Sequence, residues 1–318
     1  MHLKFSHRGR QFFFLTFVVK GRRSVLSRVV AIDRDGREEA DVELTPLGEA
    51  VIEEWKAQHG RNAALTASAR VIMPDHVHLL LIVNYDVDPR FDILDWLHHF
   101  RRAIEAKWAT LAPAGGAGAE SPSVVMWEDA FWLDLSFDSR QLKAIRRYIR
   151  LNPSRFLWKL RHPDCFVRRR GVRARVLDPA RQWDAVGDLT LLGSPFLFHV
   201  RLTLKKTVEE HEDAIAEIVD KARRGMIPVS GFISPGEKEA LRRLKQEPRA
   251  RFVKMLPYGL PPKYDPSAED SRELAARRLL VVSGFPQSVR NDPLEFRRNC
   301  LAMNDLAAAI CRRAQEEV

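Results

Sequence analysis

Two histidines, His76 and His78, are the residues of this chain whose type and spacing most directly permit chemistry. They lie in residues 71–83, a run rich in β-branched and aliphatic side chains that predicts one buried strand. Because residues i and i+2 of a strand point to the same face, the two imidazoles should project together. Paired imidazoles suit one divalent metal ion, and the alternative is a pair of half-buried packing histidines.

A predicted helix at residues 139–152 carries a second pair of functional groups. Its apolar residues recur at helical spacing, and Pro153 should end it. Tyr148 and Asn152 are four residues apart and therefore share one face of this helix. A phenol and a carboxamide near two imidazoles could form a metal-assisted nucleophile. The alternative is a packing tyrosine followed by a helix-capping asparagine.

Taken in order along the chain, these motifs resemble the REP-associated tyrosine transposases, relatives of the single-tyrosine HUH transposases of small insertion sequences. The stretch MPDHVH at residues 73–78 resembles the HUH strand of that family, and YIRLNPSR at residues 148–155 resembles its nucleophile motif. Three further stretches agree with the resemblance, which covers residues 1–160: FFLTF at 13–17, RRSVL at 22–26 and WEDAFW at 127–132.

The resemblance implies metal-dependent cleavage and transfer of single-stranded or hairpin DNA with palindromic repeats. Tyr148 would be the nucleophile and would form a covalent 5′-phosphotyrosine intermediate. His76 and His78 would be catalytic and, together with Asn152, would hold Mg²⁺ or Mn²⁺. The family fold implied for this part is a ferredoxin-like HUH domain with a mostly antiparallel sheet.

The charge of the chain favours a polyanionic partner. Its formal net charge is +10 and its pI is about 9.8. Residues 140–175 contain thirteen Lys or Arg and a single acid, Asp164, which favours contacts with phosphates over an ordinary solvated face. The arginines predicted to bind DNA are Arg146, Arg147, Arg150, Arg155, Arg168, Arg169, Arg170, Arg173 and Arg175. Five aromatic residues could stack on unpaired bases, although core packing is the stronger expectation for each of them: Trp127, Phe131, Trp132, Phe156 and Trp158.

The pattern divides the chain into residues 1–160, a basic connector at 161–190, and residues 191–318. The fold class is α+β, with a smaller Rossmann-like α/β domain second, because strands alternate with helices after residue 191. The stretch SGFISPGEK at 230–238 resembles the DNA-processing protein A family. The turn at 202–207 has no glycine to cradle a phosphate, which favours a structural or interaction domain, without a bound cofactor, over a nucleotide-binding one.

Two other functions remain open from the sequence: a nucleic-acid-binding protein without catalysis, or a nucleotide-binding Rossmann protein with a nucleic-acid tether. The three scattered cysteines form neither a metal motif nor a disulfide framework, so a cytoplasmic protein is expected. The apolar run at 12–19 is too short to span a membrane, and no membrane association is expected. Both a monomer and a homodimer are compatible with the sequence.

Overall fold

The computed structural model describes residues 8–34, 37–111, 126–129, 131–136, 138–202, 208–286 and 292–316. The chain divides into two compact units, Met1–Leu157 and Trp158–Val318. Among the described helices, none combines the length and the apolar character needed to cross a membrane. The fold is a mixture of helices and strands, with an antiparallel sheet in the first unit and a mixed sheet in the second.

The first unit is built on a four-stranded sheet with the order β4-β5-β1-β6. All neighbouring strands in it are antiparallel. The strands are β1 (Arg10–Val18), β4 (Leu65–Ile72), β5 (His76–Asn84) and β6 (Trp132–Ser136). Strands β1 and β5 are both central, so each is hydrogen-bonded to a neighbouring strand along both of its edges.

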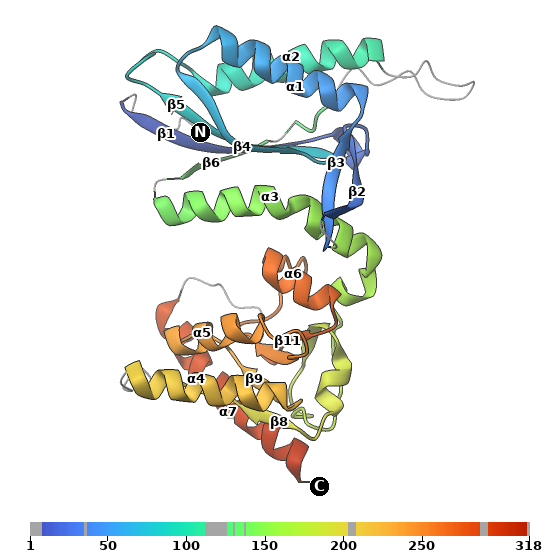
Figure 1. The fold of residues 1–318 in the computed structure, drawn as a ribbon, viewed down its shortest axis with the longest axis vertical. Coiled ribbons are helices and arrows are strands. Elements are labelled where there is room, and N and C mark those ends of the chain that lie inside the picture. Colours follow the sequence, from blue (N-terminus) through green and yellow to red (C-terminus); the bar gives the residue numbers. More distant parts are fainter. Residues whose placement is uncertain are drawn as a thin grey trace, which may run out of the picture. The chain divides into compact units, whose positions relative to one another are not determined.

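Side chains alternate along the central strands, so one face of the sheet carries the core residues and the other face carries the two histidines. Phe13, Leu15 and Phe17 of β1 are buried in one cluster with apolar residues of α1 (Pro46–Arg61) and α2 (Ile93–Leu111). Figure 1 shows these two helices on one side of the sheet and α3 (Ser139–Arg161) on the other. Thr45 caps the start of α1, where its side chain accepts a hydrogen bond from the Gly48 N–H at 3.2 Å. The even-numbered residues of β1 and β5 therefore face α3.

The prediction of one strand over residues 71–83 is wrong, because the chain reverses in the middle of that run. Strand β4 ends at Ile72, β5 begins at His76, and the two pair antiparallel with Ile72 opposite Val77. The Met73 N–H donates to the His76 carbonyl at 2.8 Å, which closes a tight turn over Pro74 and Asp75. Proline has no N–H to give to a sheet ladder, which explains the break. A second antiparallel pair is formed by β2 (Ser27–Arg34) and β3 (Arg37–Leu44), and residues 35–36 between them lie outside the described residues.

Helix α3 continues past Pro153, contrary to the prediction that the proline ends it. A proline inside a helix removes one backbone hydrogen bond and is costly on its own. Here the next turns are held by packing: Leu157 is buried with Val29 and Met73, and Phe156 packs against that cluster. Tertiary contacts therefore outweigh the local preference to stop.

The second unit contains a five-stranded mixed sheet with the order β7-β11-β10-β9-β8. Strands β8 to β11 are parallel, as expected for alternating strands and helices. Strand β7 is antiparallel to β11, so the sheet is mixed and the expectation of a parallel sheet holds only in part. The strands are β7 (Asp184–Gly187), β8 (Leu197–His199), β9 (Ile227–Ser230), β10 (Phe252–Met255) and β11 (Leu279–Ser283).

Helices cover both faces of this sheet. On one face, α4 (Val208–Arg223), α5 (Pro235–Leu244) and α6 (Ala268–Ala275) pack in a cluster that includes Leu279 and Val281. On the other, α7 (Pro293–Gln315) packs in a cluster that includes Leu280 and Val282. Alternate residues of β11 thus serve the two faces, as expected for a strand covered on both sides.

Residues 161–190, expected to be a connector, belong to the second unit. They form the 3-10 turn η2 (Pro163–Phe166) and the edge strand β7, and Trp183 is 1 % exposed in the core. A second 3-10 turn, η3 (Leu189–Gly193), follows. The sequence did not predict the short helix α6. The expected loop at 112–123 and the turn at 203–207 lie outside the described residues.

Candidate functional site

The two histidines open strand β5 on the face that α3 covers. Their ring centroids are 4.6 Å apart, with the ring planes inclined by 74°. His78 is 4 % exposed, and Val77 between them is buried in the opposite core. The strand alternation predicted from the sequence therefore brings the two imidazoles together as expected.

Each histidine is held through its Nδ1 atom. Thr16 Oγ1 on β1 lies 2.7 Å from Nδ1 of His78, and Asp75 Oδ1 lies 2.6 Å from Nδ1 of His76. Arg22 Nη1 in turn lies 3.1 Å from Asp75 Oδ2. Burial raises the pKa of Asp75, but the hydrogen bonds and charges of His76 and Arg22 outweigh it and leave that pKa below its usual value. An ionised Asp75 can therefore orient His76.

The other nitrogen of His78 is buried and available. Among the described residues, none makes a hydrogen bond with its Nε2 atom. Burial is the main reason that the pKa of His78 falls to about 3, and the charges of His76, Arg155 and Arg22 add to the effect. His78 is thus a neutral imidazole, which is the form that binds metal ions, and its Nε2 offers a lone pair in the tautomer whose Nδ1–H donates to Thr16.

Tyr148 reaches the histidine pair from α3. Its ring centroid lies 5.2 Å from that of His78 and 6.1 Å from that of Phe14, and Phe14 also stacks on His78 at 5.3 Å. The guanidinium carbon of Arg155 lies 5.0 Å from the centre of the Tyr148 ring. Tyr148 is half-buried, so its ring is fixed by these neighbours while part of it faces solvent.

Asn152 follows Tyr148 by one helical turn and is 8 % exposed. The ring contacts that join α3 to the histidines are made by Tyr148, and Asn152 lies one turn further along the same helix face. Arg155, expected to bind DNA, is only 6 % exposed and packs beneath the tyrosine ring instead of lying on the surface.

The side chains that could hold a metal ion here are two imidazoles and a carboxamide, with no thiolate among them. Within the parts of the chain that the structure describes, no three His, Cys, Asp or Glu side chains form a metal-binding group. Two imidazoles whose Nδ1 atoms are held by a hydroxyl and a carboxylate have their Nε2 atoms directed by that second set of contacts. An amide oxygen from Asn152 would complete a set of nitrogen and oxygen donors that Mn²⁺ accepts readily and Mg²⁺ less so.

Thr16, Asp75 and Phe14 lie within the quoted sequence motifs, but the sequence did not predict their contacts with the histidines. Thr16 and Phe14 lie within FFLTF, where strand alternation puts them on the face opposite the core residues Phe13 and Leu15. That alternation was the available signal. It became informative only with the pairing of β1 and β5, because Thr16 is the direct cross-strand partner of His78.

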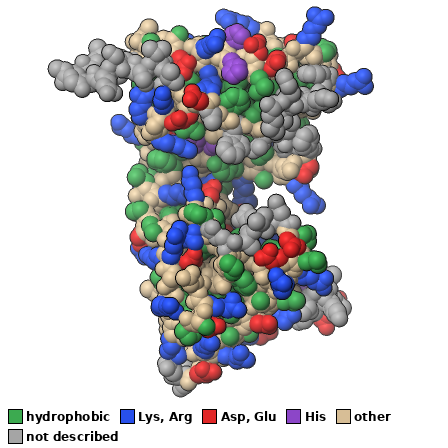
Figure 2. All heavy atoms as spheres, turned by 180° about the vertical axis from the view of Figure 1, so that it is seen from behind, with side chains coloured by type: hydrophobic (Ala, Val, Ile, Leu, Met, Phe, Trp, Pro, Cys, Tyr) green, Lys and Arg blue, Asp and Glu red, His purple; other side chains and the backbone are tan. Residues whose placement is uncertain are grey.

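The basic residues predicted to bind DNA have different environments. On α3, Arg146, Arg147 and Arg150 are exposed, and Arg146 Nε lies 2.8 Å from Ser68 Oγ. In the face shown in Figure 2, Lys and Arg side chains are spread over both units with Asp and Glu among them. The positive charge visible on that face is therefore dispersed.

The arginine run at 168–175 has intramolecular contacts that the sequence did not indicate. Arg168 forms an ion pair with Asp184 and is 13 % exposed, so the scarcity of acids within residues 140–175 does not leave it without an acidic partner. Arg169 donates to the Gly187 carbonyl at 3.0 Å and Arg173 to the Pro179 carbonyl at 2.8 Å. Arg175 donates to the Arg313 carbonyl at 2.9 Å. The acidic partner of Arg168 comes from β7, a strand that the sequence pattern did not predict.

Trp127 lies in the core and is 0 % exposed, so it cannot stack on bases in this structure. Its ring contacts Phe17 edge to face at 4.8 Å between centroids. Phe131 is partly buried, with the Arg101 guanidinium carbon 6.0 Å from its ring centre. Phe156 and Trp158 are partly buried, and the side chain of Trp132 lies outside the described residues.

Comparison with known proteins gives distant likenesses of fold. No family model matches the chain, and no curated protein matches it. A REP-associated tyrosine transposase bound to a REP hairpin is similar with a TM-score of 0.34 and 15 % identity, over 50 % of this chain and 75 % of that one. A candidate transposase from Deinococcus radiodurans R1 gives a TM-score of 0.29 and 17 % identity, over 47 % and 95 %. DNA processing protein A from Helicobacter pylori, a single-stranded DNA binder, gives 0.35 and 21 %, over 46 % and 66 %.

Proposed function

We propose that the first unit cleaves and rejoins single-stranded or hairpin DNA in a metal-dependent reaction, with Tyr148 as the nucleophile. The observation that carries the proposal is the contact of Tyr148 with His78, at 5.2 Å between ring centroids, beside a buried Nε2 that has no partner among the described residues. A tyrosine that only packed would not need two histidines oriented through their Nδ1 atoms at its ring.

The chemistry assigned to Tyr148 is an exchange of one phosphodiester for another. Its phenolic oxygen forms a bond to a backbone phosphorus, and the bond from that phosphorus to the 3′ oxygen of the preceding nucleotide breaks. The phenol proton is transferred, in net terms, to the departing oxygen, which becomes a 3′ hydroxyl. The 5′-phosphotyrosine that results keeps the energy of the phosphodiester, so a second transfer requires no nucleotide fuel.

The residues around Tyr148 supply orientation and positive charge. Arg155 is buried against the phenol ring, where a guanidinium favours negative charge developing on the oxygen. His76, His78 and Asn152 would hold Mg²⁺ or Mn²⁺. When bound, such an ion polarises the scissile phosphate and stabilises charge on the leaving oxygen. Arg146, Arg147 and Arg150, which are exposed on α3, would contact DNA phosphates.

The proposal also includes a fold family for each unit. The order β4-β5-β1-β6, with α1 after β1 and α2 after β5, is the arrangement expected of a ferredoxin-like HUH domain, with β2 and β3 added as a hairpin. The parallel strands β8 to β11, joined through helices, support a Rossmann-like assignment for the second unit. The DNA substrate with palindromic repeats and the cytoplasmic location remain parts of this proposal.

A covalent-adduct assay tests the function directly. The full chain is incubated with Mn²⁺ and labelled single-stranded hairpins made from inverted repeats near its own gene, then separated under denaturing conditions. Wild type should yield a labelled adduct and a free 3′ hydroxyl product. Tyr148→Phe should lose both yet bind the hairpin nearly as well, because only the phenolic oxygen is removed. Tyr264→Phe, a change of the same size in the second unit, is the control and should react as wild type.

Two outcomes would contradict the proposal. Adduct formation by Tyr148→Phe would mean that another residue is the nucleophile. A gel shift of the hairpin by wild type, without any adduct or cleavage, would instead favour a nucleic-acid-binding protein that lacks catalysis.

A further inference from the structure

The sheet of the second unit has a topological switch point, where two neighbouring parallel strands lead to helices on opposite faces. The loop after β10 leads to α6 on one face, whereas the loop after β11 leads to α7 on the opposite face. Loops that leave neighbouring parallel strands in opposite directions open a crevice outside the carboxyl ends of those strands. Ligands of α/β sheets bind preferentially at such points, so the β10–β11 junction is where a site is expected.

A pocket of about 440 Å³ lies at this junction. Gly259 from the loop after β10 and Gly284 and Phe285 from the loop after β11 line it. The two loops are tied together, since the Gly259 N–H donates to the Pro286 carbonyl at 2.9 Å and Ser283 Oγ to the Tyr258 carbonyl at 2.7 Å. These bonds make the floor of the pocket a fixed backbone structure.

The charged groups in this pocket are two arginines and one carboxylate. Arg168 Nε lies 3.1 Å from Asp184 Oδ2, but its Nη1 is buried and has no hydrogen-bond partner among the described residues. The Arg181 guanidinium carbon lies 6.0 Å from the centre of the Phe285 ring, and its Nε is 3.7 Å from Asp178. A buried guanidinium nitrogen without an acceptor is costly, and a ligand oxygen or a water molecule can supply that acceptor.

The other strand ends of the sheet are closed to an anion by the protein itself. Glu237, 5 % exposed, accepts hydrogen bonds from the N–H groups of Ile233 at 2.9 Å and Leu202 at 3.2 Å. Its carboxylate therefore occupies the backbone donors beyond β8 and β9 that a phosphate would otherwise use. In the described part of the β10–β11 pocket, no such internal acid occupies Arg168 Nη1.

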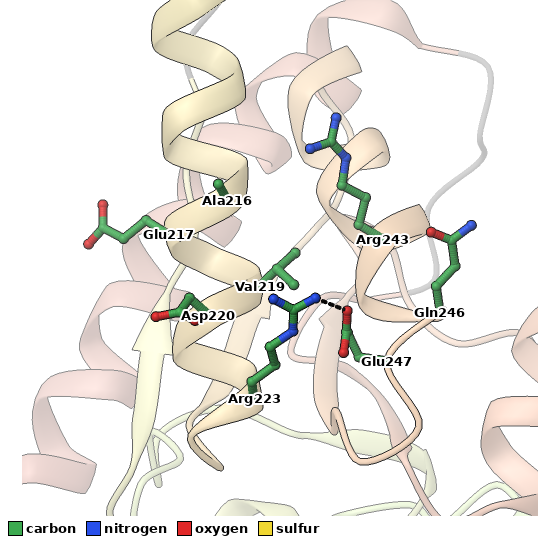
Figure 3. A pocket seen from close by; sticks show the side chains of 8 residues that line it. All are labelled: Ala216, Glu217, Val219, Asp220, Arg223, Arg243, Gln246 and Glu247. Carbon is green, nitrogen blue, oxygen red and sulfur yellow. Dashed lines mark hydrogen bonds and ion pairs between the residues drawn. The ribbon is translucent and has the colours of Figure 1, made fainter.

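A larger hollow, of about 580 Å³, lies between α4 and the end of α5 and also contains two arginines. Arg223 pairs with Glu247 at 2.6 Å (Figure 3) and Arg243 with Glu212 at 2.7 Å, and neither arginine has a buried nitrogen without a hydrogen-bond partner among the described residues. An anion entering this hollow would have to displace those carboxylates. It is therefore a poor anion site and serves as a control.

We infer that the β10–β11 pocket binds a small phosphate-bearing ligand about the size of a mononucleotide. The phosphate would accept from Arg168 Nη1 and from the guanidinium of Arg181, whose planar forks match phosphate oxygens. Gln182, at the rim, and the Phe285 ring would contact the rest of the ligand. This inference does not depend on the proposed DNA cleavage, because the site in the first unit contributes nothing to it.

Calorimetry on the full chain tests binding to the β10–β11 pocket with three probes: inorganic phosphate, adenosine 5′-monophosphate and adenosine. Phosphate and the monophosphate should bind one equivalent each, and adenosine should bind much more weakly. Arg181→Ala and Arg168→Gln should each weaken monophosphate binding at least about tenfold, the loss expected for one charge-assisted contact. Asp184→Asn removes the competing carboxylate but keeps an oxygen for Arg168, so it should tighten phosphate binding several-fold.

Controls separate binding from folding. Arg223→Ala, in the α4–α5 hollow, and Tyr148→Phe should both bind the monophosphate as wild type does. Thermal unfolding shows whether Arg168→Gln is folded, and Arg181, which is 40 % exposed, provides a variant that should not perturb the core.

Three results would overturn the inference. The first is no saturable binding of phosphate or the monophosphate by wild type up to about 10 mM, the limit of a specific site. The second is binding that both arginine variants leave unchanged. The third is binding of a short DNA oligonucleotide at these arginines without binding of the monophosphate, which would make the pocket part of a DNA surface.

Discussion

Thr16 and His78 are direct cross-strand partners in the pairing of β1 with β5, and the Thr16 hydroxyl lies 2.7 Å from Nδ1 of His78. This contact fixes which nitrogen of the buried imidazole remains available. The corresponding contact of His76 comes from its neighbour Asp75, 2.6 Å away. The two histidines are therefore oriented by different segments, His78 by strand β1 and His76 by the turn before β5, and each orienting contact can be removed separately.

Thr16→Val should weaken Mn²⁺ binding about 10- to 100-fold, the usual effect of removing the group that orients a histidine ligand. The change is nearly isosteric and leaves the strand intact, so calorimetry with Mn²⁺ reports on the missing hydroxyl. Thr16→Ser keeps the oxygen and should retain most of the affinity. Equal affinity in the Val and Ser variants would show that His78 does not need this hydroxyl.

His76→Ala and His78→Ala should each abolish measurable Mn²⁺ binding and cleavage, whereas Asn152→Ala should weaken both. A three-donor site without one of its imidazoles holds the ion poorly, and an amide oxygen is the weakest of the three donors. His99→Ala is a matched control, because that imidazole is exposed on α2 and paired with Asp95 at 3.5 Å. Unchanged metal affinity in both site variants would return the histidines to a packing role.

Neutralising Arg168, Arg169, Arg170, Arg173 and Arg175 together should weaken binding of all DNA sequences about equally. It should also flatten the dependence of log K on log salt by roughly 0.7 for each single-strand phosphate that the variant no longer binds. Within the set, Arg170→Gln should show this effect without a loss of stability, because its side chain is exposed. Arg168→Gln should lower the unfolding temperature instead, because it breaks the pair with Asp184. Selective loss of one hairpin sequence at constant salt slope would mean that these residues read bases.

Asp270→Asn should reduce the stability of the second unit by about 3 kcal/mol at pH 7, the usual cost of breaking a buried ion pair. Asp270 is 5 % exposed in its side chain and lies 2.7 Å from both Lys245 and Lys254. Burial raises its pKa, but the two lysines outweigh burial and leave that pKa below the ordinary value of 3.8.

The sign of the pH effect follows from that lowered pKa. The stability that Asp270 contributes is present above the unfolded-state pKa and is lost as pH falls through the folded-state value. The difference between wild type and Asp270→Asn should therefore be largest near neutral pH and shrink below about pH 4. Urea unfolding at several pH values measures it. Glu239→Gln, in an exposed pair with Arg242, should cost less than about 1 kcal/mol, and a similar loss in both variants would contradict the buried-pair account.

The sequence by itself determined the parts of this protein that depend on local periodicity. Strand alternation put His76 and His78 on one face, and helical spacing put Tyr148 and Asn152 on another. The apolar pattern at helical spacing over residues 139–152 also predicted the first part of α3, which begins at Ser139. These features follow from the geometry of single elements, in which side-chain direction repeats every two or every 3.6 residues.

Only the tertiary structure decided which elements meet. Local preference predicted that Pro153 ends a helix, but burial of Leu157 against Val29 and Met73 carries α3 through it. The role of Thr16 depends on the register of β1 against β5, and the partner of Arg168 depends on an edge strand that pairs antiparallel with β11. Such contacts join residues far apart along the chain, and their free energy comes from burial and pairing that no local pattern encodes.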